Sequence, residues 1–462
     1  MPVLKGRIHA GCKPGLARHF SRHQLRQIRA TGLPPSPMRY RLITFLVFGA
    51  ILTAVGEWDL RHNRFDFTRR LDSRWLEFCA GNVPDRITKP AVTLIAIDDE
   101  YQPLIEDKFS RLDCAAILDA LDDFEPPAVA FEPAVSFDES RAIMPLKEAA
   151  LKLPRIVLGA TVEDGPAPAK APKLTFHPLT KVSGDIAKVP LFTHTASGPD
   201  EELLANGDPA FTRIELQEDA VSGLVDSIPL LARQGDQIVP SFVVAALAAT
   251  LPGGLDNVEV KLPAAGQPKG TIQIGEHLRI PIDSRGHMKT FRHNGLAESQ
   301  IKRISASEMF LADSTDPAVN AQQLDLQDEF ASLKENLVVI GNDHSADRHV
   351  SVDGETKLSQ VGLLTRALAT IQSGRFISQW SSLGRVLGIL VILGLAFMLF
   401  RKNRGAVLGW GLLGTFLFFG IVMLIFKNTL LWTPPFVFMG LLGVMIVSGL
   451  ILPASFSPSK EE

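Results

Sequence analysis

Four long apolar stretches divide the chain and predict how it is organised. They lie at residues 42–56, 386–400, 406–426 and 435–452. A helix needs about 20 apolar residues to cross the hydrocarbon core of a bilayer. The shorter stretches reach this length with their flanks, where Tyr40, Trp58 and Trp380 stand as interfacial aromatic residues do. We therefore predict transmembrane helices at 40–58, 381–400, 405–426 and 432–452, with a globular region at 59–380.

Basic residues predict the orientation of these helices. The segment 1–41 contains nine Lys or Arg residues and no acid, and Arg401, Lys402 and Arg404 follow the second helix. Because basic flanks stay in the cytoplasm, segment 1–39 and the tail 453–462 are expected inside, and 59–380 in the periplasm of a bacterial inner membrane. Two alternatives remain open near the start: residues 54–56 resemble a signal-peptide cleavage site, and segment 1–39 reads equally as an amphipathic surface helix or a disordered tail.

The globular region begins with an alternation of strands and helices. Segments 91–97, 128–131 and 155–160 are short apolar runs typical of strands buried on both faces, and helical spacing at 112–124 and 146–153 separates them. This order predicts an α/β fold with a mainly parallel sheet covered by helices. Further along we expect a surface insertion at 163–208, a helix at 239–251, antiparallel strands at 270–282 and 288–292, a buried strand at 337–340 and a helix at 361–373.

Several segments, taken in chain order, resemble the CHASE2 domain, an extracytoplasmic sensory module of bacterial membrane receptors. They are 92–100, 128–133, 211–249, 281–286, 304–309, 336–347 and 360–376, and the likeness spans about 65–380. The resemblance implies a sensor domain followed by membrane helices and then by a cytoplasmic kinase or cyclase. Phe109-Ser-Arg-Leu112 stands where a Trp-Pro-Trp-like turn is expected, and Glu132 where the family often has Asp. We expect no output domain in 453–462, so signalling would act on a partner in trans.

Polar residues follow three of the predicted strands and are the candidate ligand site. They are Asp98, Asp99, Glu132, Asn342, Asp343 and Asp347. Ligands of parallel sheets bind outside the carboxyl ends of the strands, and a cluster of acids there suits a cation or a basic ligand. The alternative is that these side chains cap helices and bond to turns, as Asp and Asn commonly do.

Signals for metal binding or catalysis are weak. His344 and His349 lie among aspartates and are the only metal candidates, but their spacing belongs to no standard zinc site. The sequence contains no nucleophile elbow, P-loop or dinucleotide-binding glycine motif. We therefore expect no cofactor, no nucleic-acid partner and no enzyme, although an external hydrolase remains the third and weakest interpretation.

Small residues and cysteines complete the set of candidates. Gly405 and Gly409 form a small-xxx-small pair, which packs helices either within the chain or against another membrane protein. Cys79 and Cys114 would both face the periplasm, where they either pair or, as we expect, serve as small buried apolar residues.

Two functions fit these observations. The first is an inner-membrane sensory or accessory protein whose external domain binds a ligand or partner and passes its state through the membrane helices. The second is a structural or scaffold subunit of a cell-envelope complex. The lipid bilayer and a membrane or cytoplasmic protein are the expected partners, and the sequence leaves a homo-oligomer open.

Overall fold

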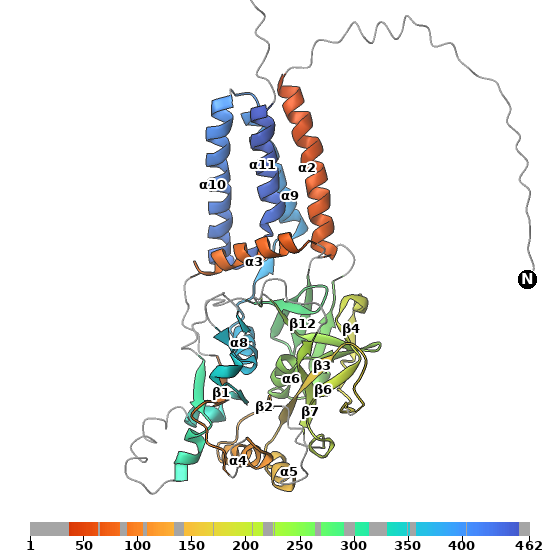
Figure 1. The fold of residues 1–462 in the computed structure, drawn as a ribbon, viewed down its shortest axis with the longest axis vertical. Helices are drawn as coiled ribbons and strands as arrows, with labels where there is room; N and C mark the ends of the chain where they lie inside the picture. Colours follow the sequence, from red (N-terminus) through yellow and green to blue (C-terminus); the bar gives the residue numbers. More distant parts are fainter. Residues whose placement is uncertain are drawn as a thin grey trace, which may run out of the picture.

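The structure is a computed structural model, and it describes residues 37–62, 65–83, 90–104, 109–133, 143–169, 171–205, 207–215, 225, 227–263, 269–290, 301–313, 330–348, 350–351, 357–402 and 404–451. A helical bundle forms one end of the molecule and a mixed α/β domain the other (Figure 1). Residues 1–36, which were expected to form either a surface helix or a disordered tail, lie outside the described residues, as do the tail 453–462 and His349.

The centre of the α/β domain is a sheet of seven strands in the order β15-β1-β16-β2-β3-β6, with β7 also pairing with β3. All neighbours are parallel except β3 and β6, which confirms the predicted, mainly parallel sheet. The strands are β1 (Val92–Ile97), β2 (Val129–Phe131), β3 (Ile156–Glu163), β6 (His194–Ser197), β7 (Gly207–Glu215), β15 (Lys302–Ser305) and β16 (Leu337–Asn342).

Helices cover both faces of this sheet. Ile95 and Ile97 of β1 pack on the face covered by α4 (Arg111–Asp122) and α5 (Ile143–Lys152). Leu94 and Ala96 pack on the opposite face, against α6 (Phe242–Ala249) and α8 (Gln360–Gln372). Successive side chains of a strand point to opposite faces, so a strand covered on both sides buries its side chains on both and is mostly apolar. All six residues of β1 are buried for this reason.

Short strands complete the domain. They are β4 (Lys181–Ser183), β5 (Leu191–Phe192), β8 (Ser227–Pro229), β9 (Leu231–Gln234), β10 (Gln237–Pro240), β11 (Val258–Lys261), β12 (Gly270–Ile274), β13 (Leu278–Ile282), β14 (His287–Lys289), β17 (Val350–Ser351) and β18 (Lys357–Leu358). Most of them pair antiparallel, but β4 pairs with β11 and β5 with β9 in parallel. The pairing of β12 with β13 and of β14 with β8 is antiparallel, as predicted for 270–282 and 288–292.

Three predicted segments differ in the structure. The helix expected at 239–251 starts only at Phe242, because β10 occupies the preceding residues and Ser241 caps the helix. Segment 304–309, which resembles the short helix before the last strand of a CHASE2 domain, instead begins with the end of β15, and a 3₁₀ turn starts only at Glu308. Segment 163–208 is more than a surface insertion: it supplies β6 to the central sheet, and Phe176 and Phe192 within it are buried against each other. Because the segment is polar overall, its few buried aromatic residues could not be recognised from its composition.

The bundle contains α2 (Pro37–His62), α9 (Ser382–Leu399), α10 (Arg404–Thr429) and α11 (Pro435–Ile451), which lie side by side (Figure 1). Only α2 and α10 are long and apolar enough to count as candidate membrane spans, at Arg39–Asp59 and Gly405–Thr429. This finding reduces the four predicted spans to two. The helices α9 and α11 have 18 and 17 residues and rise only about 27 and 26 Å, against a hydrocarbon core of about 30 Å.

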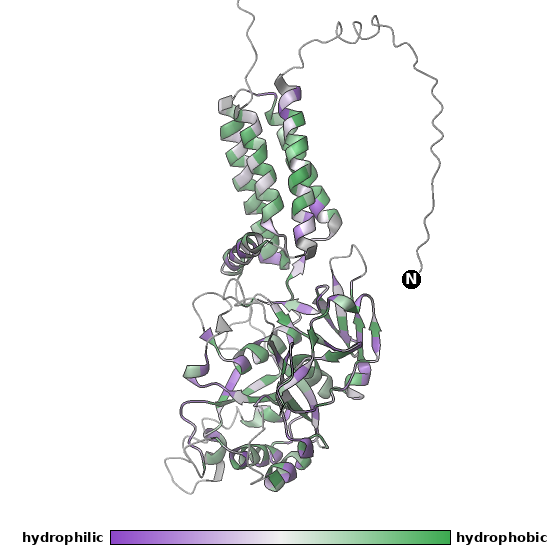
Figure 2. Cartoon of the chain, turned by 45° about the vertical axis from the view of Figure 1, so that its right-hand side comes forward, coloured by the Kyte–Doolittle hydropathy of each residue, from purple (hydrophilic) through white to green (hydrophobic). Residues whose placement is uncertain are grey.

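The helices of the bundle are mostly hydrophobic along their length (Figure 2), and many of their large apolar side chains are exposed. Phe416 is 76% exposed and Met398 69%. Both basic flanks lie at the end far from the α/β domain, where Arg41 donates to the carbonyl of Lys402. At the other end Arg385 forms an ion pair with Glu57, 2.8 Å apart.

Glycines bring α2 close to α11. A Cβ placed on Gly440 would lie 2.6 Å from a methyl group of Leu52, and one placed on Gly56 would collide with Val437. The predicted packing pair is different, since Cβ atoms on Gly405 and Gly409 would meet no described atom within 4 Å. Within the described residues this pair therefore makes no helix contact, and the intermolecular alternative stays a prediction.

A small junction joins the domain to the bundle. The segment after α8 forms β19 (Ser378–Gln379), which pairs with β20 (Leu431–Trp432) between α10 and α11. Ile377 packs there against Trp432 and against α3 (Asp66–Ala80), which lies across the end of the bundle (Figure 1). Lys289 of the domain stands 5.3 Å from the Trp432 ring. Cys79 of α3 and Cys114 of α4 are free and buried in separate clusters, so they do not pair.

Candidate functional site

The carboxyl ends of β1, β16 and β2 meet at one edge of the central sheet, as the sequence predicted. Ile97 is in register with Asn342, and the amide of Asp343 donates to the carbonyl of Ile97 at 2.9 Å. The amide of Glu132 donates to the carbonyl of Ile340 at 2.8 Å. The polar residues that follow the three strands therefore lie close together, as parallel pairing requires.

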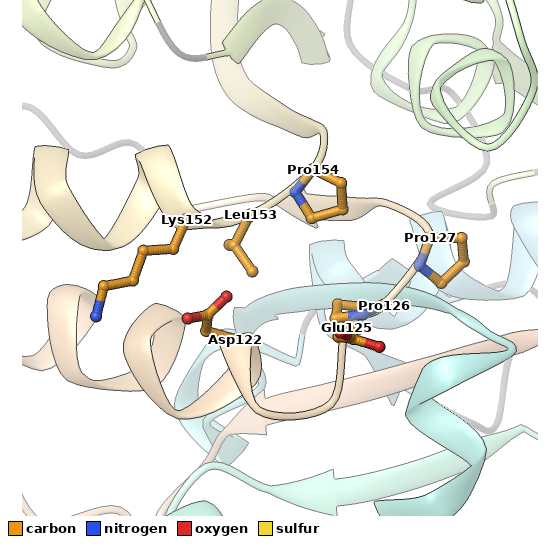
Figure 3. Close-up of a pocket in the computed structure, with 7 residues that line it drawn as sticks. All are labelled: Asp122, Glu125, Pro126, Pro127, Lys152, Leu153 and Pro154. Atoms are coloured by element: carbon orange, nitrogen blue, oxygen red, sulfur yellow. The ribbon is translucent and has the colours of Figure 1, made fainter.

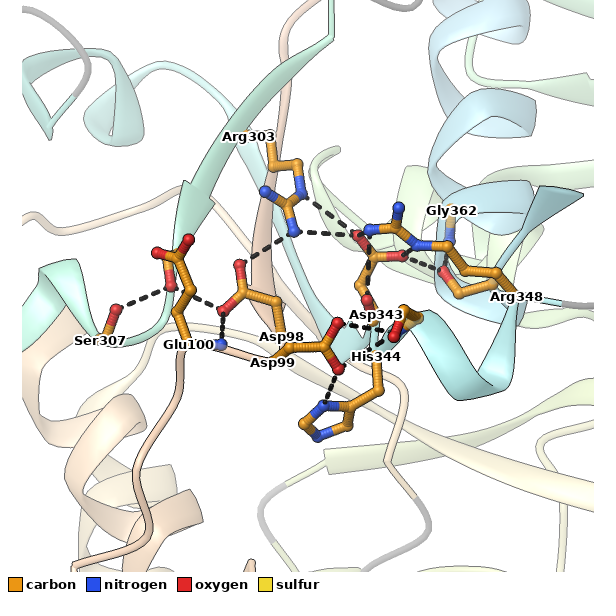
Figure 4. Close-up of polar contacts among 12 residues, drawn as sticks. Asp98, Asp99, Glu100, Arg303, Ser307, Asp343, His344, Arg348 and Gly362 are labelled. Carbon is orange, nitrogen blue, oxygen red and sulfur yellow. Dashed lines mark hydrogen bonds and ion pairs between the residues drawn. The ribbon is translucent and has the colours of Figure 1, made fainter. Parts of the chain in front are cut away.

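Two arginines occupy the centre of this edge (Figure 4). Arg303 lies on β15, beside β1, and its guanidinium bridges Asp98 at 2.9 Å and Asp343 at 3.1 Å. Arg348 approaches Asp343 from the other side, at 2.8 Å. The two carboxylates are only 9% exposed, whereas the arginine side chains are 43% and 40% exposed. We call these four residues the strand-end network.

Hydroxyl groups complete the bonding of the two buried carboxylates. Ser305 donates to Asp98 at 2.9 Å, and Ser359 donates to Asp343 at 2.6 Å. Ser359 is also the N-cap of α8, since its oxygen accepts from the amide of Gly362 at 3.0 Å. A buried charge is tolerated only when it is paired and hydrogen-bonded, and both aspartates satisfy this condition.

The exposed candidates form a second layer. Asp99 accepts from the amide of Ser345 and contacts the ring of His344 at 3.2 Å. These bonds, led by that of the Ser345 side chain, lower the pKa of Asp99. Asn342 donates to Asp347 at 2.7 Å. These contacts agree with the turn and cap alternative for the polar residues, and they leave the outer oxygens of Asp99 and Asp347 near solvent.

Glu132 differs from the other candidates because its environment is apolar. The residue is half-buried, but its carboxylate lies against Gly341, where a Cβ would come within 3.1 Å of its oxygen. Burial raises the pKa of Glu132 to about 7, the amide of Asn342 partly opposes the rise, and the charge of Asp347 adds to it. Glu132 therefore gains and loses its proton near neutral pH.

Arg303 and Arg348 were missed in the sequence. Arg303 follows Lys302 in the short strand Lys302–Ser305, and Arg348 follows Asp347 within the His-Asp segment that was considered as a metal candidate. A buried acid needs a cationic partner, so the acids predicted to be buried indicated that such a partner exists. They did not indicate which residue it is, because Arg303, the partner of Asp98, lies more than 200 residues away in the chain.

The described residues contain no group of three His, Cys, Asp or Glu side chains placed to hold a metal ion. His344 contacts Asp99 instead, and His349 is outside the described part of the chain.

A cavity of about 460 Å³ lies at the opposite edge of the sheet (Figure 3). Its lining comes from the loops that precede β2 and β3 and from the ends of α4 and α5, namely Asp122, Glu125, Pro126, Pro127, Lys152, Leu153 and Pro154. Two of the charged lining residues form exposed ion pairs, Lys152 with Asp119 and Glu125 with Lys334. This cavity does not involve any of the predicted site residues.

The chain matches no known family, no curated protein and no solved structure. Function must therefore be argued from the strand-end network and from the bundle.

Proposed function

We propose that this chain is a sensory or accessory protein of the bacterial inner membrane. Its CHASE2-like α/β domain lies in the periplasm, and α2, α9, α10 and α11 cross the bilayer. The domain binds a ligand or a protein partner at the strand-end network. Its state then passes through the bundle to a separate protein in the membrane or the cytoplasm.

The bundle supports the membrane part of this proposal. Large apolar side chains on a bundle surface are unfavourable in water and favourable in lipid. Arg41 and Lys402 lie in contact at the end far from the domain, which places both basic flanks on one side, as the preference of basic residues for the cytoplasm requires. The helices α9 and α11 reach across when their flanks and local thinning of the bilayer are included.

The network supports recognition of a basic group. Among the described residues of this edge, Asp98, Asp99, Asp343 and Asp347 outnumber the two arginines of the network. The arginines are already shared by the buried carboxylates, so an anionic ligand would have to compete for them. A cationic or zwitterionic ligand, or a basic side chain of a partner, would instead meet the outer oxygens of Asp99 and Asp347.

The observation that carries the proposal is the direct bond between Asp343 and Ser359. It joins the network to the first turn of α8, and the last turn of α8 leads through Ile377 into the junction and α9. A change at the network that alters this bond acts on the helix that enters the bundle. Such a continuous path is a hypothesis about coupling, which only a coupling measurement can establish.

Ser359→Ala tests this path. Loss of an N-cap costs about 1 kcal/mol, so amide exchange at the start of α8 should become about fivefold faster. We expect faster exchange also at the amides of Ser378 and Trp380, which bond across the junction to Leu430 and Trp432. Hydrogen exchange with mass spectrometry on the full chain in detergent measures both regions.

Ser110→Ala is the matched control, because Ser110 caps α4 on the other face of the sheet. It should speed exchange in α4 and leave the junction unchanged. If Ser359→Ala loosens α8 and the junction exchanges as in the wild type, the path does not exist.

A scaffold function is the second candidate, and one observation favours it. Arginines and hydroxyls already satisfy the buried part of the network, so the edge needs no ligand to be stable. Asp99→Asn separates the two candidates, since it removes an exposed charge at the outer layer. A sensor should lose its response to its ligand or partner, whereas a scaffold should assemble in unchanged yield on native purification in mild detergent.

A further inference from the structure

The helix α3 carries two stripes that differ in what they touch. Positions 68, 72, 76 and 79 follow helical spacing, and Thr68, Leu76 and Cys79 among them are buried against the rest of the chain. Positions 67, 71, 75 and 78 are Phe, Leu, Trp and Phe and form the neighbouring stripe. We call these four residues the aromatic stripe.

The two ends of the aromatic stripe are exposed, whereas Leu71 and Trp75 between them are half-buried. Phe67 is 68% exposed and Phe78 is 56% exposed. Two phenylalanines this exposed on one short helix need a covering that the described residues of the chain do not provide. The stripe is confined between the buried face and a polar face on which Arg70 and Arg74 are exposed.

The position of α3 identifies the covering. The helix lies across the end of the bundle (Figure 1), and Trp75 of the stripe packs edge-on against Phe419 of α10, with ring centres 5.1 Å apart. Trp75 also stacks on Phe78, at 5.7 Å. The stripe is therefore continuous with the apolar outer surface of a helix that is long enough to span a membrane.

We propose that α3 lies in the headgroup layer of the bilayer, on the side of the α/β domain, with the aromatic stripe inserted at the acyl boundary. A helix with adjacent apolar and basic faces adopts this position, and aromatic rings are enriched at this depth. Arg70, and Arg74 with its ion-pair partner Glu77, lie on the polar face, where the arginines complement anionic headgroups. The proposal rests on the membrane placement proposed above and adds a second contact with lipid.

This placement has a mechanical consequence. The buried face of α3 packs against Ile377 and Trp432 in the junction, so lipid holds the junction from one side while α8 holds it from the other. The domain is then fixed close to the membrane surface.

Depth-dependent quenching in nanodiscs tests the proposal. The full chain, with Cys12→Ser, receives one new cysteine for an environment-sensitive nitrobenzoxadiazole label at Phe78→Cys, Phe67→Cys or Arg74→Cys. Cys79 and Cys114 remain, because they are buried, and a sample without a new cysteine sets the background. The nanodiscs contain phosphatidylethanolamine and phosphatidylglycerol, with doxyl lipids labelled at a shallow or a deep carbon.

We expect labels at 78 and 67 to lose about half of their fluorescence to the shallow quencher and the label at 74 to lose little. Equal, weak quenching at all three positions would show that α3 stands away from lipid, covered by a protein or by water. Phe416→Cys on α10 is the reference, since that residue is 76% exposed in the bundle. If 416 is quenched by the deep label and 78 is not, only the α3 proposal fails. If 416 is unquenched, the membrane placement fails as well.

Discussion

At Asp98 and Asp343 two carboxylates lie buried side by side, and their surroundings explain why this is stable. Arg303 contacts both, Arg348 contacts one, and Ser305 and Ser359 supply hydroxyl donors. Buried ions lose several kcal/mol of hydration, which is recovered only when each has a partner of opposite charge and further hydrogen bonds. The network therefore fixes how the five segments that carry these residues are arranged, and it adds little to the net free energy of folding.

Glu132 gives the domain a dependence on pH. Its folded pKa is about 7 against an ordinary 4.5, so the folded protein keeps this proton over a range in which the unfolded chain has lost it. Stability from this group is therefore complete below about pH 4.5 and decreases as the pH rises to about 7, by up to about 3 kcal/mol.

Glu132→Gln should remove this dependence, because the amide has no proton to lose. Thermal unfolding of the full chain between pH 4.5 and 8 should show a falling midpoint for the wild type and a flatter profile for the variant. Glu276→Gln, on an exposed turn, is the control and should follow the wild type. Parallel profiles for wild type and Glu132→Gln would contradict the assignment.

At the scale of elements, the contact between α2 and α11 depends on residues without side chains. Gly56 faces Val437 and Gly440 faces Leu52 so closely that a Cβ would not fit without movement. In lipid, close approach of helix backbones supplies much of the association energy, because the hydrophobic effect does not favour helix contact there.

Gly56→Val should therefore force α2 away from α11. The β-branched side chain of Val437 is stiff and cannot turn aside easily, so we expect a loss of about 1–3 kcal/mol. Gly420→Val is the matched control, because a Cβ there would meet no described atom within 4 Å. Thermal midpoints in detergent should fall for the first variant only, and equal midpoints would mean that the packing is looser than the structure shows.

At the scale of the whole molecule, a basic end and the α/β domain lie at opposite ends of the long axis (Figure 1). Basic residues stand at one end of the bundle and the α/β domain at the other, with an apolar surface between them (Figure 2). A chain with this layout has one orientation of lowest free energy in a membrane, with the basic end in the cytoplasm.

Accessibility to a membrane-impermeant maleimide checks this orientation. Glu276→Cys, on the exposed turn between β12 and β13, should react in intact spheroplasts. Lys402→Cys, exposed between α9 and α10, should react only after lysis. Reaction of Lys402→Cys in intact cells, with Glu276→Cys protected, would invert the orientation and exclude a periplasmic sensor.

The local pattern of apolar residues was sufficient to predict the elements whose side chains are buried along their whole length. Every residue of β1 is buried and all but Thr93 are apolar because both faces of the strand are covered, and the alternation β1-α4-β2-α5-β3 followed directly from such runs. The acids after the strands were also found in the sequence, since parallel strands place their carboxyl ends together. Four full-length spans were predicted, whereas the described α9 and α11 are shorter than a candidate span; an apolar stretch shows composition but not where a helix begins and ends.

Tertiary structure alone decided the chemistry of the site. Asp98 meets Arg303 across about two hundred residues of chain, and no local pattern marks a pair so distant in sequence. The same holds for Glu132, whose pKa depends on what is packed around it, and for the exposed stripe of α3, whose residues read as ordinary core until the fold left them uncovered. Periodicity is a property of neighbours along the chain, whereas charge pairing and exposure depend on neighbours in space.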